Sequence, residues 1–312
     1  MTTVRNDVHL TRKVPGAASA AVRLLAGGRR VVWADVQDEV HKGALTSAAS
    51  QVLRNAASMA RDKRLPWVLS MASAGADIKE GVSALHGWGE AARAISECSG
   101  VVPTIAIGDG PAVSGPALLI GLCDAVIMTS ESYAFVSGPT MVAQMTGVEV
   151  SNEELGGTDI HSRQSGVANL VANDLEHATA LLDELLRYLP DHVDELTAII
   201  ESGDAVERDC PELNTLLPAS PTGSYDVRHV IESIVDDGVH LELRAGWASN
   251  VVTTLASIGG RAVGIVANLV ANDLEHAEAL LDELLRYLPD HVDELTAIIE
   301  SGDAVERDCP EL

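Results

Sequence analysis

The chain has 312 residues, of which 46% are hydrophobic and 21% charged, and it carries a formal net charge of −25. These values are typical of a soluble globular protein with one large domain or two ordinary ones. The acidic charge excludes nucleic acid and anionic membranes as natural partners, because both would be repelled. No uncharged apolar stretch reaches the roughly 18 residues of a membrane span, and the N-terminus shows no secretion signal. The four cysteines lack metal-ligand spacing, so we expect reduced thiols in a cytoplasmic protein and no metal site.

Short apolar runs alternate with helical patterns through the first half of the chain. Residues 1–20 have the polar composition of a flexible arm, and the regular pattern begins after them. The apolar runs predict strands at 30–36, 67–72, 104–108 and 125–129. The helical patterns predict helices at 44–60, 82–98 and 114–122. Strands and helices in this order predict an α/β fold with a mostly parallel sheet covered by helices.

A 47-residue segment is present twice, as residues 167–213 and 266–312, and the copies differ only at Thr179, which is Glu278 in the second. The first copy contributes −10 and the second −11 to the net charge of −25. Solenoid repeats diverge and need about three stacked copies, so we interpret the pair as a recombined or engineered joint. The acidic residues are expected on solvated helix faces, and an acidic docking surface is the alternative.

The first copy opens with an amphipathic helical pattern at 175–189, which Asn173 or Asp174 can cap and Pro190 ends. A second short helical pattern at 196–200 stops at Gly203.

Residues 213–223 contain two prolines and predict a linker. Beyond it we expect strands at 241–244, 251–257 and 262–267, the last two forming a hairpin around Gly259-Gly260.

Two glycine-rich loops, at 73–81 and 108–116, join predicted strands to predicted helices. Small residues let a ligand approach the backbone, and N–H groups at a helix N-terminus favour negative charge. Two such loops can aim two N–H donors at one thioester oxygen, which makes an oxyanion hole. A tight turn that packs a helix on a strand needs the same glycines, so spacing alone leaves both interpretations open.

The string Ala74-Gly75-Ala76-Asp77-Ile78-Lys79-Glu80 resembles the first oxyanion loop of the crotonase (enoyl-CoA hydratase) superfamily. The stretch from Gly110 to Gly115, followed by Cys123-Asp124, is similar to the second. The resemblance implies a crotonase-like (ClpP/crotonase) ββα superhelix. It also implies a catalytic oxyanion hole of backbone N–H groups from Ala76 and Gly115, with Ser114 beside them.

The branch of the superfamily is indicated by missing carboxylates. A hydratase needs two carboxylates for acid–base chemistry, and the matching positions hold Leu118 and Thr140. Further motifs resemble the β subunits of biotin-dependent acyl-CoA carboxyltransferases, of the acetyl- and propionyl-CoA carboxylase type. These motifs are Gln37-Asp38, Gly43-Ala44, Gly87-Trp88-Gly89-Glu90, Val101-Val102-Pro103, Phe135-Val136-Ser137-Gly138-Pro139, Glu153-Glu154-Leu155-Gly156-Gly157, His161, Ser165-Gly166-Val167-Ala168, Tyr188-Leu189-Pro190 and the run 226–268.

This resemblance implies carboxyl transfer between carboxybiotin and the α-carbon of a small acyl-CoA, through an enolate held by backbone N–H groups. Biotin would come on a partner, a biotin carboxyl carrier or biotin carboxylase subunit, and its ureido nitrogen would take the α-proton without a protein base or metal. The family's paired domains imply a homo-oligomer. Besides the oxyanion residues, the substrate-binding positions that follow are Gly75, Ala74, Lys79, Gly110 and Pro139.

Three residues depart from the family pattern. Ala74 and Ser114 stand where glycines are usual, and Asp77 stands where arginine is usual, which would weaken attraction for the CoA phosphates. The resemblance stops after Asn268, so we expect a truncated, partial second crotonase-like unit followed by the duplicated acidic helical segment. The expected division is a flexible arm at 1–20, an acyl-CoA-binding domain at 21–190, an acidic helix and linker at 191–223, the start of a second domain at 224–268, and the rest of the repeated copy at 269–312.

Two alternative functions are kept. One is a biotin-independent decarboxylase of malonyl- or methylmalonyl-type thioesters, which needs one oxyanion hole and a proton source. The other is a non-catalytic assembly or scaffold protein. His41, His86 and His161 are expected to be surface or satisfied histidines, and Cys98 and Cys123 packing residues. Ser114 has no His/Asp partner at a recognisable spacing, which argues against a serine hydrolase.

Overall fold

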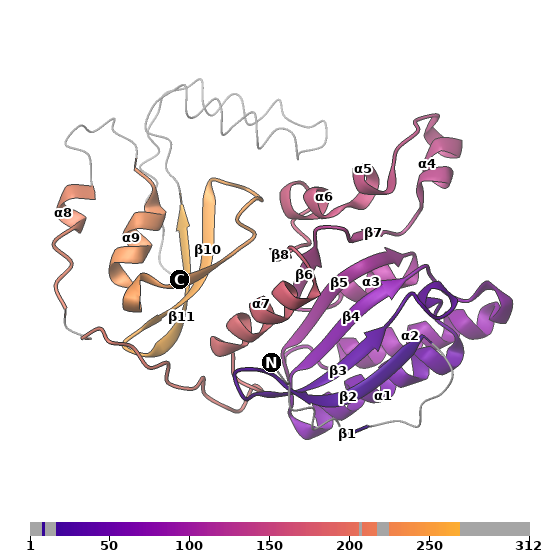
Figure 1. Cartoon of the computed structure of the whole chain (residues 1–312), viewed down its shortest axis with the longest axis horizontal. Coiled ribbons are helices and arrows are strands. Elements are labelled where there is room, and N and C mark those ends of the chain that lie inside the picture. The colour runs from indigo at the N-terminus through magenta and orange to yellow at the C-terminus, as the bar shows by residue number, and fades with distance from the viewer. Residues whose placement is uncertain (1–7, 10–16, 206–207, 217–224, 269–312) are drawn as a thin grey trace, which may run out of the picture. The chain divides into compact units, whose positions relative to one another are not determined.

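The computed structural model describes residues 8–9, 17–205, 208–216 and 225–268. The described residues up to 216 and those at 226–268 belong to one compact unit, the first of two into which the chain divides. Every helix and strand named below belongs to the first unit (Figure 1).

The main sheet has eight strands in the order β1-β2-β3-β4-β5-β6-β8, with β7 paired to β5 off this path. Strands β3 through β8 pair in parallel, whereas β1, β2 and β3 pair antiparallel at one edge. The strands are β1 (Val8–His9), β2 (Ala18–Leu24), β3 (Arg30–Val36), β4 (Trp67–Ser73), β5 (Thr104–Val113), β6 (Ala125–Thr129), β7 (Tyr133–Phe135) and β8 (Leu170–Ala172). The predicted mostly parallel sheet is confirmed.

Helices cover both faces of this sheet because successive side chains of a strand point to opposite faces. On β3, Val32 and Ala34 pack into one buried cluster, with α1 (Ser47–Lys63) and α2 (Val82–Ser96). Val31 and Trp33 pack into a second cluster, with the apolar face of α7. Figure 1 shows α1 and α2 beside each other along the sheet and α7 (Leu175–Arg187) on the other side. The buried sheet therefore serves as a rigid base for the loops at the carboxyl ends of its strands.

The remaining elements follow the sheet or form a smaller one. Strands β9 (His240–Leu243), β10 (Val251–Ile258) and β11 (Arg261–Asn268) make a three-stranded antiparallel sheet. Gly259 and Gly260 turn the β10–β11 hairpin at φ values of 58° and 72°, which glycine adopts without steric cost. The other helices are α3 (Gly115–Gly121), α4 (Pro139–Thr146), α5 (Asn152–Gly156), α6 (Thr158–Arg163), α8 (Leu213–Leu216), α9 (Val227–Ile234), and the 3-10 turns η1 (His41–Gly43), η2 (Ile78–Glu80) and η3 (Asp236–Gly238).

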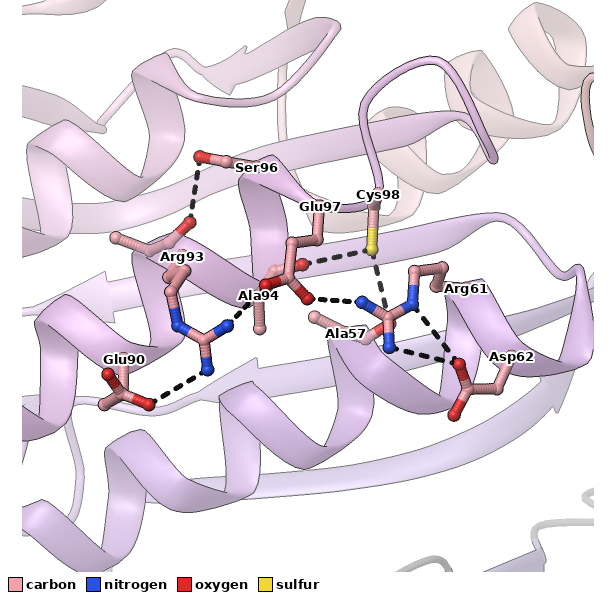
Figure 2. A network of polar contacts seen from close by, with 10 residues as sticks. Ala57, Arg61, Asp62, Glu90, Arg93, Ala94, Ser96, Glu97 and Cys98 are labelled. Carbon is pink, nitrogen blue, oxygen red and sulfur yellow. Dashed lines mark hydrogen bonds and ion pairs between the residues drawn. The ribbon is translucent and has the colours of Figure 1, made fainter.

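Charged side chains join α1 to α2 (Figure 2). Arg61 of α1 forms an ion pair with Glu97, and Arg93 of α2 pairs with both Glu90 and Glu97. Beside this network Cys98 is buried, and burial raises the pKa of its thiol to about 11. The predicted packing role of Cys98 is confirmed, and the network helps to fix α2, which carries Trp88.

Most predicted elements are confirmed within a few residues. Strands at 30–36 and 125–129 have the expected bounds, and the hairpin around Gly259-Gly260 is present. The helix expected at 44–60 begins at Ser47 because the Thr46 side chain accepts the N–H of Ala49 and caps it. For the helix expected at 175–189, Asp174 is the cap, accepting the N–H of His177.

Three expectations differ from the structure. Residues 8–9 and 18–20 of the expected flexible arm lie in β1 and β2. The short helix predicted at 196–200 is wrong, because this segment is not helical. The N–H of Ile200 instead donates to the Gly260 carbonyl at 2.8 Å. Strand β5 is longer than expected and continues to Val113, so most of the second glycine-rich stretch is strand.

The linker expected at 213–223 begins with α8, and residues 217–223 lie outside the described residues. So does the second copy of the repeat from residue 269, including its expected helix. The expected domain division stays a prediction.

Candidate oxyanion site

The first loop leaves β4 and is fixed by a short parallel bridge to Leu45. The Leu45 N–H donates to the Gly75 carbonyl and the Asp77 N–H donates to the Leu45 carbonyl, both at 2.9 Å. This bridge uses the residues on either side of Ala76, so the Ala76 N–H has no hydrogen-bond partner among the described residues. Gly75 has a φ of +120°, a conformation that side chains rarely adopt, so a glycine is required here.

A buried serine supports the start of this loop. The Ser73 hydroxyl donates to the Gly43 carbonyl at 2.6 Å and accepts the Gly75 N–H at 3.3 Å. The Ala74 N–H donates to the Lys42 carbonyl at 2.9 Å. The loop is thus tied to the segment before α1 through backbone groups, which keeps the direction of the Ala76 N–H independent of exposed side chains.

The second loop connects β5 to α3 at Ser114. The Ser114 N–H donates to the Phe135 carbonyl of β7 at 2.8 Å, and the residue has φ 64° and ψ −122°. Gly115 follows as the first residue of α3, and a Cβ atom added to it would lie 3.2 Å from the Trp88 ring. The Gly115 N–H is one of the orphan donors of a helix start and has no partner within the described part of the chain.

The two loops meet at the carboxyl ends of β4 and β5. A Cβ atom on Gly75 would lie 3.5 Å from the Val113 carbonyl oxygen and 4.0 Å from the Ser114 Cβ. The structure therefore brings together the predicted residues Gly75, Ala76, Ser114 and Gly115. Two unpaired N–H donors on adjoining loops can hold the oxygen of a carbonyl group that gains negative charge.

Other predicted site residues lie around these loops in different roles. Lys79 lies in η2 with an exposed side chain, and its N–H is held by the Asp77 carboxylate at 2.8 Å. Gly110 lies in β5, where an added Cβ would be 3.0 Å from the Ala72 Cβ, so it permits close approach of β4. Pro139 begins α4, and Ala74 is exposed. No contact in the described part of the chain links Lys79 or Pro139 to the two free N–H groups.

Carboxylates collect near the carboxyl ends of the strands. Burial raises the pKa of Asp109 on β5 above its ordinary value, and the charges of Asp35, Asp38 and Asp174 raise it further. Within the described residues, no group of three or more His, Cys, Asp or Glu residues could hold a metal ion.

The candidate nucleophiles and bases have structural roles. His161 is half-buried and hydrogen-bonded through both ring nitrogens, as predicted for a satisfied histidine. Burial raises the pKa of the Cys123 thiol, in keeping with a packing residue. Asp124 accepts the N–H and hydroxyl of Thr104 at 2.8 Å, which closes the loop before β6.

Two supports of the site were not singled out from the sequence. Trp88, which packs against Gly115, belongs to the Gly87-Trp88-Gly89-Glu90 motif, and that motif was the signal that could have identified it. Leu45, which orders the first loop through its backbone, has no sequence signal because every residue except proline has these N–H and carbonyl groups.

The family model described as "carboxyl transferase domain" matches residues 25–272. The chain belongs to this family. It is 39% identical over 203 residues to the methylmalonyl-CoA carboxyltransferase 12S subunit of Propionibacterium freudenreichii subsp. shermanii, a match that covers 65% of this chain and 38% of that protein. It is 36% identical to the propionyl-CoA carboxylase beta chain of Roseobacter denitrificans and 34% identical to the methylmalonyl-CoA decarboxylase subunit alpha of Veillonella parvula. Each of these two matches covers 77% of this chain and 47% of the relative.

A solved structure of transcarboxylase 12S, described as a hexamer with hydrolysed methylmalonyl-coenzyme A bound, superposes with a TM-score of 0.82 at 30% identity. The superposition covers 95% of this chain and 64% of that one. The predicted crotonase-like fold and carboxyltransferase family are therefore confirmed. The chain spans about half or less of the length of the curated relatives it matches. In the described part of the chain, no helix is long and apolar enough to cross a bilayer.

Proposed function

We propose that this chain provides the acyl-CoA half of a carboxyltransferase site. The observation that carries the proposal is the meeting of two loops whose Ala76 and Gly115 N–H groups have no partner among the described residues. A small acyl-CoA, such as acetyl-, propionyl- or methylmalonyl-CoA, would place its thioester oxygen between these two donors. Lys79 and Pro139 are the proposed outer contacts of the CoA part.

The two N–H groups act on the α-carbon through the thioester oxygen. When a proton or a carboxyl group leaves the α-carbon, its electron pair delocalises onto this oxygen, and fixed donors stabilise the enolate. Removing one such donor costs about 100- to 1000-fold in rate in well-studied cases. The donors belong to a rigid backbone, so they need no reorganisation during the reaction.

The residues around the donors fit a reaction whose base comes from outside the chain. The positions where a hydratase would have carboxylates are Leu118, on α3, and Thr140, on α4. Carboxybiotin on a partner protein would supply the carboxyl group and, at its ureido nitrogen, the base for the α-proton. A biotin carboxyl carrier or biotin carboxylase subunit is the proposed partner, and we assign no described residue to biotin.

The comparisons support a multi-subunit assembly. The solved transcarboxylase 12S is described as a hexamer, and we propose a homo-oligomer for this chain in a cytoplasmic setting. The decarboxylase and scaffold alternatives gain no specific observation from the structure, and the experiments below separate them.

The proposal is tested by calorimetric titration of the protein with propionyl-CoA. We expect saturable binding, weakened about tenfold in Ala76→Pro and in Gly115→Pro, because each change removes one N–H donor to the thioester oxygen. Gly121→Ala is the matched control, since a Cβ at this end of α3 meets nothing within 4 Å. Circular dichroism verifies that each variant is folded.

Incubation with methylmalonyl-CoA then distinguishes the reactions. Carboxyl transfer predicts propionyl-CoA formation that depends on added biotin as the carboxyl acceptor. Release of CO2 at the same rate without biotin would indicate the decarboxylase. Absence of any acyl-CoA binding would contradict both enzymes and leave a scaffold role.

A further inference from the structure

The three-residue strand β7 holds the second loop. Its residues Tyr133, Ala134 and Phe135 pair with 111–113 of β5, and the Phe135 carbonyl accepts the Ser114 N–H at 2.8 Å. Ser114 needs this support because its φ of 64° lies in a region that residues other than glycine rarely adopt. The direction of the next N–H, that of Gly115, therefore depends on where β7 lies.

Contacts from α5 and α6 fix β7 in turn. His161 of α6 donates its Nε2–H to the Ala134 carbonyl at 2.8 Å, a direction of donation fixed by the carbonyl, which can only accept. Gly156 lies directly beside this carbonyl, where an added Cβ would be 2.1 Å from the oxygen. Gly157 forms an antiparallel bridge with Tyr133. Strand β7 is thus held by β5 on one side and by this turn and His161 on the other.

The ring of His161 is itself oriented. The other ring nitrogen, Nδ1, lies 2.8 Å from the Ser165 hydroxyl oxygen. Ser165 Oγ also accepts the Val167 N–H at 3.4 Å. The ring is therefore held at both nitrogens, by the Ala134 carbonyl on one side and by Ser165 on the other.

We propose that His161 is a positioning residue for the oxyanion hole, acting through the Ala134 carbonyl and β7 on the Ser114–Gly115 peptide. This inference rests on the proposed function of the Gly115 N–H. His161 does not touch the thioester in this account; its ring sets the position of β7, and β7 sets the direction of the donor. Loss of the His161 hydrogen bond should therefore weaken binding of the thioester oxygen more than binding of the rest of the CoA molecule.

The test combines amide exchange with a pair of ligands. Hydrogen–deuterium exchange at Ser114 reports on the hydrogen bond to Phe135. Propionyl-CoA and S-propyl-CoA, which has CH2 in place of the carbonyl, differ only in the group that the N–H donors contact. We expect the wild type to prefer the thioester about tenfold.

In His161→Leu we expect faster Ser114 exchange and a loss of most of the thioester preference, with the affinity for S-propyl-CoA unchanged. His161→Gln restores both, because its side-chain amide N–H can replace Nε2–H. His229→Leu, a change of an exposed histidine on α9, alters neither measurement. If His161→Leu does not fold, Ser165→Ala gives the same directions of change, since it releases the ring from its Nδ1 contact.

The outcomes separate this inference from the proposed function. Unchanged Ser114 exchange, or an unchanged thioester preference, in the folded His161→Leu and Ser165→Ala proteins would overturn the positioning role. A wild type that does not prefer the thioester would overturn the oxyanion site itself, and the role of His161 in it.

Discussion

The two loops of the site each orient a backbone N–H, but they do so by different structural means. The first loop uses a glycine, Gly75 at φ +120°, and a backbone bridge to Leu45. The second places a serine, Ser114, in a positive-φ conformation and supports it with β7 and with Trp88 beneath Gly115. Each loop leaves one N–H without a partner among the described residues. The difference shows that a special backbone conformation can come either from residue type or from surrounding contacts, and only the first is visible in the sequence.

The largest effects are expected where each loop rests on a glycine. An added Cβ would lie 2.0 Å from the Ala72 carbonyl at Gly43, which supports the first loop, and 2.1 Å from the Ala134 carbonyl at Gly156, which supports the second. Gly43→Ala and Gly156→Ala are each expected to lower the free energy of unfolding by about 3 kcal/mol, as overpacking against backbone does. Urea denaturation measures both, with Gly89→Ala as control, because a Cβ there meets nothing within 4 Å.

Gly43→Ala is expected to speed amide exchange in the first loop only, and Gly156→Ala in the second only. If either change speeds exchange equally in both loops, the two loops form one cooperative unit. That result would contradict the claim that they are supported independently.

A smaller effect is expected at the contact between Gly115 and Trp88. Gly115→Ala places a Cβ 3.2 Å from the indole ring, which must shift by a few tenths of an ångström, and we expect a loss of about 1 kcal/mol in unfolding free energy. Trp88→Leu makes room for this Cβ, so the double variant should lose less than the two single changes added together. Additive losses in a denaturation cycle would argue that Trp88 does not constrain the second loop.

Ser114→Gly is expected to stabilise the protein. Glycine adopts positive φ without the cost of about 1–3 kcal/mol, although it loses about 0.5–1 kcal/mol through a more flexible unfolded chain. The net gain should be about 1 kcal/mol in the unfolding free energy from urea titration. A loss of stability would mean that the serine hydroxyl supports the loop in a way that its exposed position does not indicate.

Asp109→Asn should have a smaller effect that depends on pH. Burial, and then neighbouring acids, raise the pKa of Asp109 in the folded state, so folding favours the protonated carboxyl. The wild type therefore loses stability as the pH rises from the unfolded pKa through the raised folded value. At pH 7 the variant should be about 0.5 kcal/mol more stable than the wild type, and the difference should vanish near pH 3. Thermal melts at both values provide the measurement, and a gain that is the same at both would contradict the assigned cause.

The sequence predicted those parts of the fold that local pattern determines. The fully buried run of β6, the run of β3 and the Gly-Gly hairpin were found because apolar runs and turn residues are local signals. Ile200 could not be predicted as non-helical, since its N–H is satisfied by the carbonyl of Gly260, far along the chain. Strand β8 was missed because three residues between a loop and a helix form no recognisable pattern.

The repeated segment shows most clearly that the same residues adopt different structures in different surroundings. Val-Ala-Asn occurs at 167–169 and again at 266–268. In the first copy Asn169 is buried and its Oδ1 accepts the Val126 N–H at 2.8 Å, just before β8. In the second copy the same three residues form the end of β11, with Asn268 opposite Val251. Identical residues therefore take their structure here from the strand that lies beside them.

The site was predictable to a similar extent. The residue types of both loops, and hence Ala76 and Gly115, came from the resemblance to a known family. Their support by Leu45, Phe135 and His161 came only from the structure, because it depends on backbone groups and on contacts between segments distant in the sequence.

The central claim is that the Ala76 and Gly115 N–H groups hold one thioester oxygen. Isotope-edited infrared spectroscopy of propionyl-CoA labelled with 13C at the carbonyl measures this directly, because hydrogen bonds to the oxygen lower the C=O stretching frequency. We predict a lower frequency in the complex than in water, and a partial return toward the value in water in both Ala76→Pro and Gly115→Pro. A bound carbonyl whose frequency equals that in water, or is unaffected by either change, would contradict the account.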